Sequence, residues 1–174
     1  MDDDGLSYSA RGATAPASRP WPASPPGFRR FERTVTIGRG EDAWAAAGQA
    51  VLQWEVKRRS GFAVTPADGG GIGVREGGRY TITAGRGPFV VREPVEVVAV
   101  VDTRDRRGFA SGTRWGHPVS GEEAFVVHRD ADGRVLLTLR SLTRAAPAGR
   151  WRLLFPVLLL AQLGARTRYV RALP

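Results

Sequence analysis

Cysteine is absent from this 174-residue sequence, lysine occurs once, and no hydrophobic run is long. The lack of cysteine excludes disulfides, zinc sites built on thiolates and cysteine nucleophiles, and it is compatible with a reducing compartment. The longest apolar stretch, Leu153 to Ala161, falls short of the ~20 residues that a spanning helix needs, and Pro156 interrupts it. Residues 2–4 are all aspartate, which is the wrong charge for a secretion signal, and no apolar region follows them. We therefore expect a cytoplasmic protein without a transmembrane segment.

The net charge of +9 comes almost entirely from arginine, because Lys57 is the only lysine. From Gly133 to the end there is no acid, and there are eight arginines: Arg134, Arg140, Arg144, Arg150, Arg152, Arg166, Arg168 and Arg171. Such a surplus attracts nucleic acids and acidic membranes without specificity, while a GC-rich genome would explain the arginines without any partner. Because no recognisable nucleic-acid-binding module and no interleaved aromatic residues accompany them, we expect a solvated basic face and no specific nucleic-acid partner.

The chain divides into a tail and one domain. Residues 1–27 contain five prolines among Ala, Ser and Gly, with few apolar residues to bury. This composition is typical of a disordered tail, although Trp21 could dock onto the domain. Residues 28–174 contain no internal repeat, and we expect them to form a single domain.

The periodicity of the domain changes from helical to alternating. Acids at 41 and 42 suit a helix N-terminus, and apolar residues at 44, 47, 51 and 54 recur at helical spacing. They predict an amphipathic helix of about four turns that ends near Arg59, with Gly61 as its stop. The predicted strands are 33–37, 72–74, 79–83, 88–91, 95–101, 108–112, 122–128 and 134–142. Their short connections require antiparallel neighbours, so from residue 71 onwards we expect a meander.

The last segment, Pro147 to Leu173, is predicted to be one long helix. Trp151, Leu154, Phe155 and Leu158 share one face of it, but further leucines and Val157 cover most of the rest. A helix that is apolar nearly all round is either buried on more than one side or in contact with a membrane.

Two stretches carry a resemblance to a known family. The first is Ile37-Gly-Arg-Gly-Glu41, followed by apolar residues including Trp44 and Trp54. The second and more specific comprises Gly112-Thr113, Gly116-His117-Pro118 and Ser120-Gly-Glu-Glu-Ala-Phe125. Both resemble the DUF1990 family, a domain of unknown function, over roughly residues 31–173. The chain departs from the family pattern at Arg114-Trp115, where a small or apolar residue and a proline usually stand.

The order of elements resembles the helix-grip fold of START and Bet v 1-like proteins. That resemblance implies an α+β protein in which a curved antiparallel sheet of six or seven strands wraps a long C-terminal helix and leaves a cavity between them. Fold alone does not imply function, and the DUF1990 family carries no established activity.

The densest group of reactive side chains is His117, Glu122 and Glu123, with His128 further along the strand. A histidine and a carboxylate at a cavity mouth could perform acid–base catalysis, with His117 paired to Glu122 or Glu123. Two histidines and a carboxylate could also hold a metal, although no third imidazole supports this and we expect neither a metal nor a cofactor. Alternatively, His117-Pro118 shapes a loop, and the glutamates form hydrogen bonds with turn backbone or ion pairs with arginines. By alternation, Glu122 and His128 share one face of the strand and Glu123 takes the other.

Among the tryptophans, Trp44 and Trp54 lie on the apolar helix face and are expected in the core. Trp115 has no periodic reason to be buried, so it is a candidate ligand lid together with the ligand-binding candidates His117, Glu122 and His128.

Three functions remain open. The favoured one is a module that binds a small apolar or amphipathic molecule in the cavity. The second is an enzyme that uses the same cavity, and the third is an interaction or membrane-surface protein that uses the basic C-terminal helix. Whether the protein is an enzyme, and its oligomeric state, are left open by the sequence.

Overall fold

Seven strands form one antiparallel sheet in the computed structural model, which describes residues 5–85 and 87–173. The strands are β1 (Arg29–Arg39), β2 (Ala63–Pro66), β3 (Arg79–Ala84), β4 (Val91–Asp102), β5 (Arg106–Thr113), β6 (Val119–Arg129) and β7 (Arg134–Ala145). Their order in the sheet is β1-β7-β6-β5-β4-β3-β2. Strands β2 to β7 are thus a continuous meander, which was predicted from residue 71 onwards, and β1 is added beside β7.

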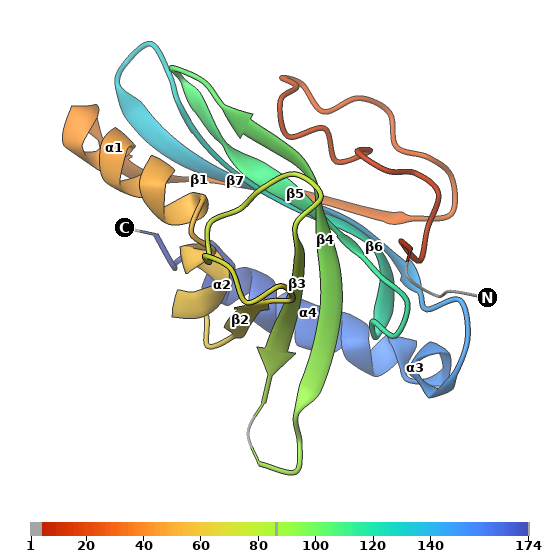
Figure 1. Ribbon diagram of the computed structural model, residues 1–174. Helices are drawn as coiled ribbons and strands as arrows, with labels where there is room; N and C mark the ends of the chain where they lie inside the picture. The colour runs from red at the N-terminus through yellow and green to blue at the C-terminus, as the bar shows by residue number, and fades with distance from the viewer. Residues whose placement is uncertain (1–4, 86, 174) are drawn as a thin grey trace.

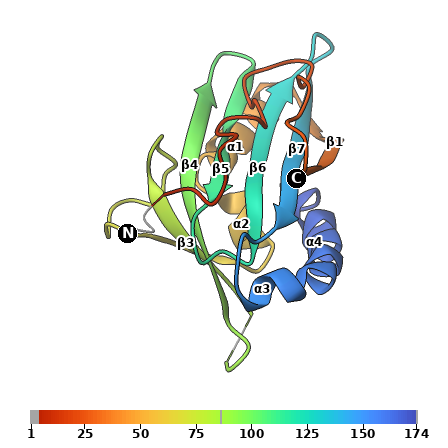
Figure 2. The same cartoon turned by 90° about the vertical axis from the view of Figure 1, so that its right-hand side faces the viewer.

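The helices cover one face of this curved sheet. They are α1 (Gly40–Val51), α2 (Glu55–Arg59), α3 (Arg150–Leu153) and α4 (Phe155–Tyr169). Figure 1 shows α1, α2 and α4 on the same side, which we call the inner face. The chain before β1 crosses the opposite, outer face (Figures 1 and 2). A curved antiparallel sheet that holds a C-terminal helix confirms the predicted helix-grip architecture.

The first predicted helix is broken in two at Trp54. α1 ends at Val51, and Trp54, which adopts left-handed backbone angles with φ at 61°, is the residue from which α2 starts. The left-handed conformation costs of order 1–2 kcal/mol for a residue with a Cβ. In return the indole is fully buried, with its centroid 4.4 Å from that of Phe109 and 4.9 Å from that of Tyr80. Trp44 is also buried, so the prediction of two core tryptophans is confirmed.

The last predicted helix is also divided. α3 ends at Leu153 and α4 starts at Phe155, with Pro156 in its first turn. Proline lacks the N–H that a helix interior needs, but it fits the first turn of a helix. The prediction of one continuous helix over 147–173 was therefore wrong at this point. Within the described residues, no helix has both the length and the apolar character required to cross a bilayer.

Some strand predictions also need correction. Residues 72–74 form no strand, and 88–91 contribute only the first residue of β4. Strand β2 was missed because its four residues, Ala63–Pro66, are too short to show alternation and end in proline. β1 and β6 extend beyond their predicted bounds, because pairing with β7 continues through residues of low strand propensity.

The segment before β1 differs most from the expectation of disorder. Residues 5–27, here called the N-terminal segment, follow the outer face of the sheet, and Tyr8, Thr14 and Trp21 are buried there. Trp21 lies beneath the Arg30 guanidinium, whose central carbon is 3.7 Å from the ring centroid. This segment therefore forms part of the folded domain, which does not begin at residue 28.

Candidate functional site

A cavity of about 240 Å³ lies between the inner face of the sheet and α4. Its walls are mostly apolar, with a group of ionisable side chains at the α2 side. The polar side chains that line it include Lys57, Glu93, His117, Glu123, Gln162 and Tyr169. At about 30 Å³ per water molecule, the space would hold about eight waters, or one compact organic molecule.

Small side chains on the sheet make this cavity. The core beneath α1 is filled by large residues of the inner face, such as Leu137, Leu139 and Phe125. Closer to the β5–β6 loop, the positions that line the cavity are instead serine, threonine and glycine: Ser111, Thr113, Gly121, Ser141 and Thr143. Gly121, with φ at +148°, is also required by the backbone, because a Cβ there would collide with the Leu142 carbonyl oxygen.

Helix α4 closes the cavity without filling it. Its residues Leu158, Gln162, Ala165 and Tyr169 recur at helical spacing and line the space. Only the C-terminal part of α4 is tightly packed, since Ala165 and Tyr169 belong to the core. The N-terminal half therefore stands off the sheet and leaves the cavity beneath it.

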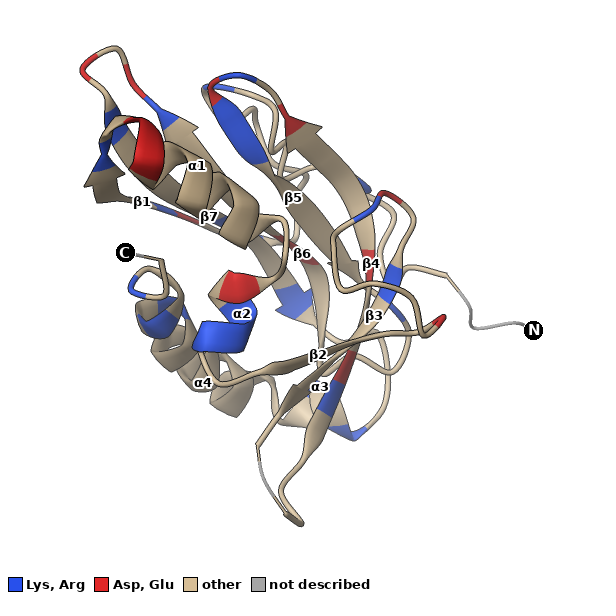
Figure 3. Ribbon diagram, turned by 60° about the vertical axis from the view of Figure 1, so that its left-hand side comes forward, with Lys and Arg blue, Asp and Glu red and all other residues tan. Residues whose placement is uncertain are grey.

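The only lysine of the sequence lies at the polar end of the cavity. Lys57 Nζ donates to Glu123 Oε2 at 2.6 Å and to the Tyr169 hydroxyl at 2.8 Å, and it lies 4.6 Å from the Tyr169 ring centroid. Burial lowers the pKa of Lys57, but attraction to Glu123 and Tyr169 outweighs burial and raises the pKa above its ordinary value. The side chain is therefore a permanent ammonium ion. Figure 3 shows its helix, α2, lying between α1 and α4.

Glu93 on β4 is the second acid of this group. Burial raises the pKa of the Glu93 carboxyl, against the attraction of Lys57, and the Glu123 charge raises it further. No hydrogen bond joins this carboxyl to any residue that the structure describes, although the side chain lines the cavity. We call Lys57, Glu93, Glu123 and Tyr169 the charged cluster.

Two further polar groups face the same space. Gln162 Oε1 on α4 is buried and has no hydrogen-bond partner among the described residues. Nδ1 of His117 accepts the backbone N–H of Val119 at 3.1 Å, and burial, helped by the Lys57 charge, lowers the pKa of His117 to about 3. His117 is thus neutral at pH 7, too weak a base for efficient proton abstraction there.

The structure separates the residues that the sequence grouped together. His117 and Glu123 line the cavity, but the Glu122 carboxylate and His128 lie on the outer face, as strand alternation predicts. An acid–base pair of His117 with Glu122, or a metal site that uses both histidines, is therefore not assembled. Of the four predicted ligand-binding residues, Trp115 and His128 do not line the cavity, and Glu122 lines it without directing its carboxylate there.

Glu122 holds the N-terminal segment. Its buried carboxylate accepts hydrogen bonds from the Tyr8 hydroxyl at 2.6 Å, the Gly12 N–H at 2.8 Å and the Thr14 N–H at 2.9 Å, and also from the Thr14 hydroxyl. Burial, followed by the Glu122 charge, raises the pKa of Tyr8. The alternative given for the glutamates, bonding to backbone, therefore describes Glu122.

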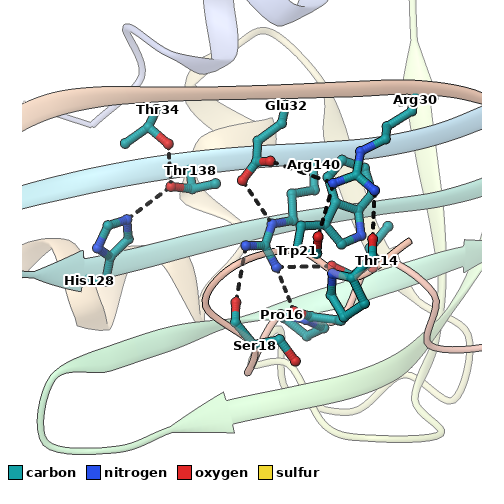
Figure 4. A network of polar contacts seen from close by, with 12 residues as sticks. Thr14, Pro16, Ser18, Trp21, Arg30, Glu32, Thr34, His128, Thr138 and Arg140 are labelled. Atoms are coloured by element: carbon teal, nitrogen blue, oxygen red, sulfur yellow. Dashed lines mark hydrogen bonds and ion pairs between the residues drawn. The ribbon is translucent and has the colours of Figure 1, made fainter. Parts of the chain in front are cut away.

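A second outer-face network anchors the rest of the segment (Figure 4). The buried Arg140 donates to the carbonyl oxygens of Ala15 at 2.6 Å and Ser18 at 3.0 Å, and to Glu32 at 3.2 Å. His128 Nε2 lies 2.9 Å from the Thr138 hydroxyl in the same network. Burial, reinforced by the positive charge of Arg106, lowers the pKa of His128 to about 4.

Sequence reasoning missed Lys57, Glu93 and Tyr169 as site residues. The three belong to different elements, α2, β4 and α4, so no local motif joins them. One signal was present, because a single lysine among 26 basic residues marks a position that arginine does not fill.

Two known proteins are similar to this chain in sequence. A UPF0548 protein of Deinococcus radiodurans is 33% identical over 169 residues, which cover 86% of this chain and 79% of that protein. A UPF0548 protein of Arabidopsis thaliana is 28% identical over 126 residues, or 69% of this chain and 60% of that protein.

Solved structures share the fold at low identity. A hypothetical protein from Helicobacter pylori superposes with a TM-score of 0.57 at 12% identity, covering 83% of this chain and 84% of that one. Ginseng major latex-like protein 151 superposes with a TM-score of 0.53 at 15% identity, covering 85% of this chain and 99% of that one. Norcoclaurine synthase from Thalictrum flavum, in complex with dopamine and hydroxybenzaldehyde, superposes with a TM-score of 0.54 at 13% identity. The match covers 82% of this chain and 84% of that one. The family model described as a domain of unknown function, DUF1990, matches residues 7–172, and the chain belongs to that family.

Proposed function

We propose that this protein binds a small amphipathic molecule in the cavity between the sheet and α4. The observation that carries the proposal is the composition of the cavity, which combines apolar walls with a few converging polar groups at one end. Such a combination is typical of ligand sites, where the walls supply affinity and the polar groups fix orientation. The complex of the norcoclaurine synthase with dopamine and hydroxybenzaldehyde supports the proposal, since the same fold holds small molecules there.

The unpartnered groups indicate what the ligand carries. Gln162 Oε1 is a buried acceptor to which no described residue donates, and the Glu93 carboxyl lines the same cavity without a hydrogen bond to any described residue. A buried acceptor without a donor costs about 1–3 kcal/mol, which a ligand hydroxyl or amine would recover. We therefore infer a ligand with an apolar body and one or two hydrogen-bond donors that point towards α2.

A cavity-filling variant tests this function. Ala161 of α4 lines the cavity, so Ala161→Phe should fill part of it, whereas Ala46→Phe on the exposed side of α1 should not. Native mass spectrometry before and after organic extraction should detect a small molecule with the wild type and Ala46→Phe, and none with Ala161→Phe. Titration with the fluorophore anilinonaphthalene sulfonate should give the same ranking. Equal fluorophore binding by all three proteins would contradict the proposal.

An enzyme that uses the same cavity is the second candidate, and Glu93 is the observation that favours it. A carboxyl whose pKa burial has raised, beside an ammonium ion and a phenol, can hold and release a proton in the cavity. Under this alternative Glu93→Gln blocks turnover without abolishing binding, so the variant would co-purify with a molecule of different mass from that in the wild type. An identical mass in both proteins would favour a binding module.

A further inference from the structure

Exposed apolar side chains gather on three segments. Among residues 5–85 and 87–173, every large hydrophobic side chain that is exposed belongs to one of them: Phe89 and Val90 of the β3–β4 hairpin, Trp115 of the β5–β6 loop, and Leu153, Leu154, Val157, Leu160 and Leu163 of α3 and α4. Phe89 is 83% exposed and Leu153 is 84% exposed. Isolated exposed leucines are common, but their confinement to three segments is not.

The topology brings these segments to one end of the molecule. In an antiparallel meander, alternate connections leave the sheet at the same end. The pairing of Ala84 with Val91, Val95 with Thr113 and Val119 with Ala145 places the hairpin, the β5–β6 loop and the start of the β7–α3 connection at that end. Figures 1 and 2 both show them in the lower half of the view.

The charge of these segments has one sign. Residues 77–92, 113–121 and 133–174 contain no aspartate or glutamate. Arg92, Arg150 and Arg152 are exposed within them. Arginine guanidinium groups bind phosphate through paired hydrogen bonds, and tryptophan favours the boundary between lipid and water. Exposed leucines flanked by arginines, without acids, fit an anionic lipid surface better than a protein surface of mixed charge.

The cavity reaches the same three segments. Its lining includes Ala84 and Val91 at the base of the hairpin, Pro118 at the end of the β5–β6 loop, and Leu158 on α4. The apolar surface and the cavity therefore adjoin each other at the same end of the molecule.

We propose that this end, hereafter the docking surface (Phe89 and Val90 of the β3–β4 hairpin, the β5–β6 loop and the outer side of α3 and α4), binds to anionic phospholipid bilayers. Phe89, Trp115 and the leucines enter the interface, and the arginines contact lipid phosphates. Docking does not depend on the cavity having a ligand. A further step, in which an amphipathic ligand passes between bilayer and cavity, rests on the proposed function.

Vesicle flotation with the full-length protein tests the docking. The wild type should float with vesicles of phosphatidylcholine and phosphatidylserine (7:3) and not with pure phosphatidylcholine, and 0.5 M salt should release most of it. Near an anionic surface each arginine contributes about 1 kcal/mol. Arg150→Ser combined with Arg152→Ser should therefore weaken binding about 30-fold. Leu153→Gln combined with Leu160→Gln should also weaken it, since both residues are exposed and need not affect folding.

A matched control separates this surface from general basic charge. Arg39 at the end of β1 and Arg104 in the β4–β5 connection are exposed at the opposite end of the sheet, and replacing both with serine removes the same charge. If this control weakens binding as much as the α3 pair does, or if the wild type fails to float with anionic vesicles at low salt, the proposal is refuted. If light scattering shows a dimer that the Leu153→Gln, Leu160→Gln variant does not form, and the wild type does not bind vesicles, a second copy of the chain covers this surface instead of a bilayer.

Failure of docking and failure of ligand binding are distinguishable. Fluorophore binding by Ala161→Phe reports on the cavity without vesicles, and flotation of the same variant reports on docking. If both proposals hold, Ala161→Phe loses fluorophore binding and still floats with anionic vesicles. Fluorophore binding at the wild-type level would contradict the ligand proposal alone, and a wild type that does not float would contradict the docking proposal alone.

Discussion

Replacing Lys57 with methionine should strongly destabilise the fold. The lysine side chain is only 9% exposed and its partner Glu123 is 21% exposed, with 2.6 Å between Nζ and Oε2. Removal of one partner from a buried ion pair costs about 3–5 kcal/mol, because the other charge is left without compensation. The cavity beside Glu123 can admit water, which reduces the penalty, so we expect a loss of about 2–3 kcal/mol in the free energy of unfolding.

Urea unfolding at pH 7, followed by tryptophan fluorescence, to which the buried Trp44 and Trp54 contribute, measures this loss. Arg58→Met is the matched control, since Arg58 lies on the same helix in a surface pair with Glu55 and should contribute under about 1 kcal/mol. Glu123→Gln added to Lys57→Met should recover about 1–2 kcal/mol, because it removes the uncompensated charge. If Lys57→Met falls within about 0.5 kcal/mol of the Arg58 control, the buried-pair reasoning is refuted.

Two further predictions concern the outer face and the histidines. Glu122→Gln should cost about 2 kcal/mol in stability, since its charged hydrogen bonds to the N-terminal segment are lost, and should speed trypsin cleavage after Arg11. Cleavage at the wild-type rate would contradict that role. The folded-state pKa values of His117, about 3, and His128, about 4, lie below the ordinary 6.5, so below pH 6.5 the unfolded chain binds protons that the folded chain does not. The free energy of unfolding should therefore fall as the pH drops from 6.5 to 4, by about 2 kcal/mol per histidine at pH 5. His117→Gln should reduce this pH dependence in urea unfolding. An unchanged pH dependence would contradict the prediction.

The sequence was most informative where contacts are local. Alternation placed the strands β3 to β7 and separated Glu122 from Glu123, because successive side chains of a strand must point to opposite faces. The helical spacing of Trp44 and Trp54 identified the core side of α1. It could not show that a left-handed residue at position 54 would divide the helix, since that conformation depends on the ring contacts of Trp54.

The remainder depends on contacts between distant residues. Composition suggested disorder for the N-terminal segment, but it is held by Glu122 and Arg140, more than a hundred residues away. The charged cluster has the same character, because Lys57 and Tyr169 are 112 positions apart. A propensity scale evaluates neither the long-range hydrogen bonds nor the space left by small residues of the sheet.

The position of the N-terminal segment has a consequence for biosynthesis. Residues 5–27 leave the ribosome before their partners on β5 to β7, which are made about a hundred residues later; Ser7, for example, bonds Thr113 and Ser120. At roughly 5–20 residues per second, the segment waits for several seconds or more without a surface to bind. Its proline-rich, weakly apolar composition suits this interval, since it gives a nascent chain little tendency to aggregate. A composition typical of disorder can thus belong to a segment that becomes ordered only after its partners have been made.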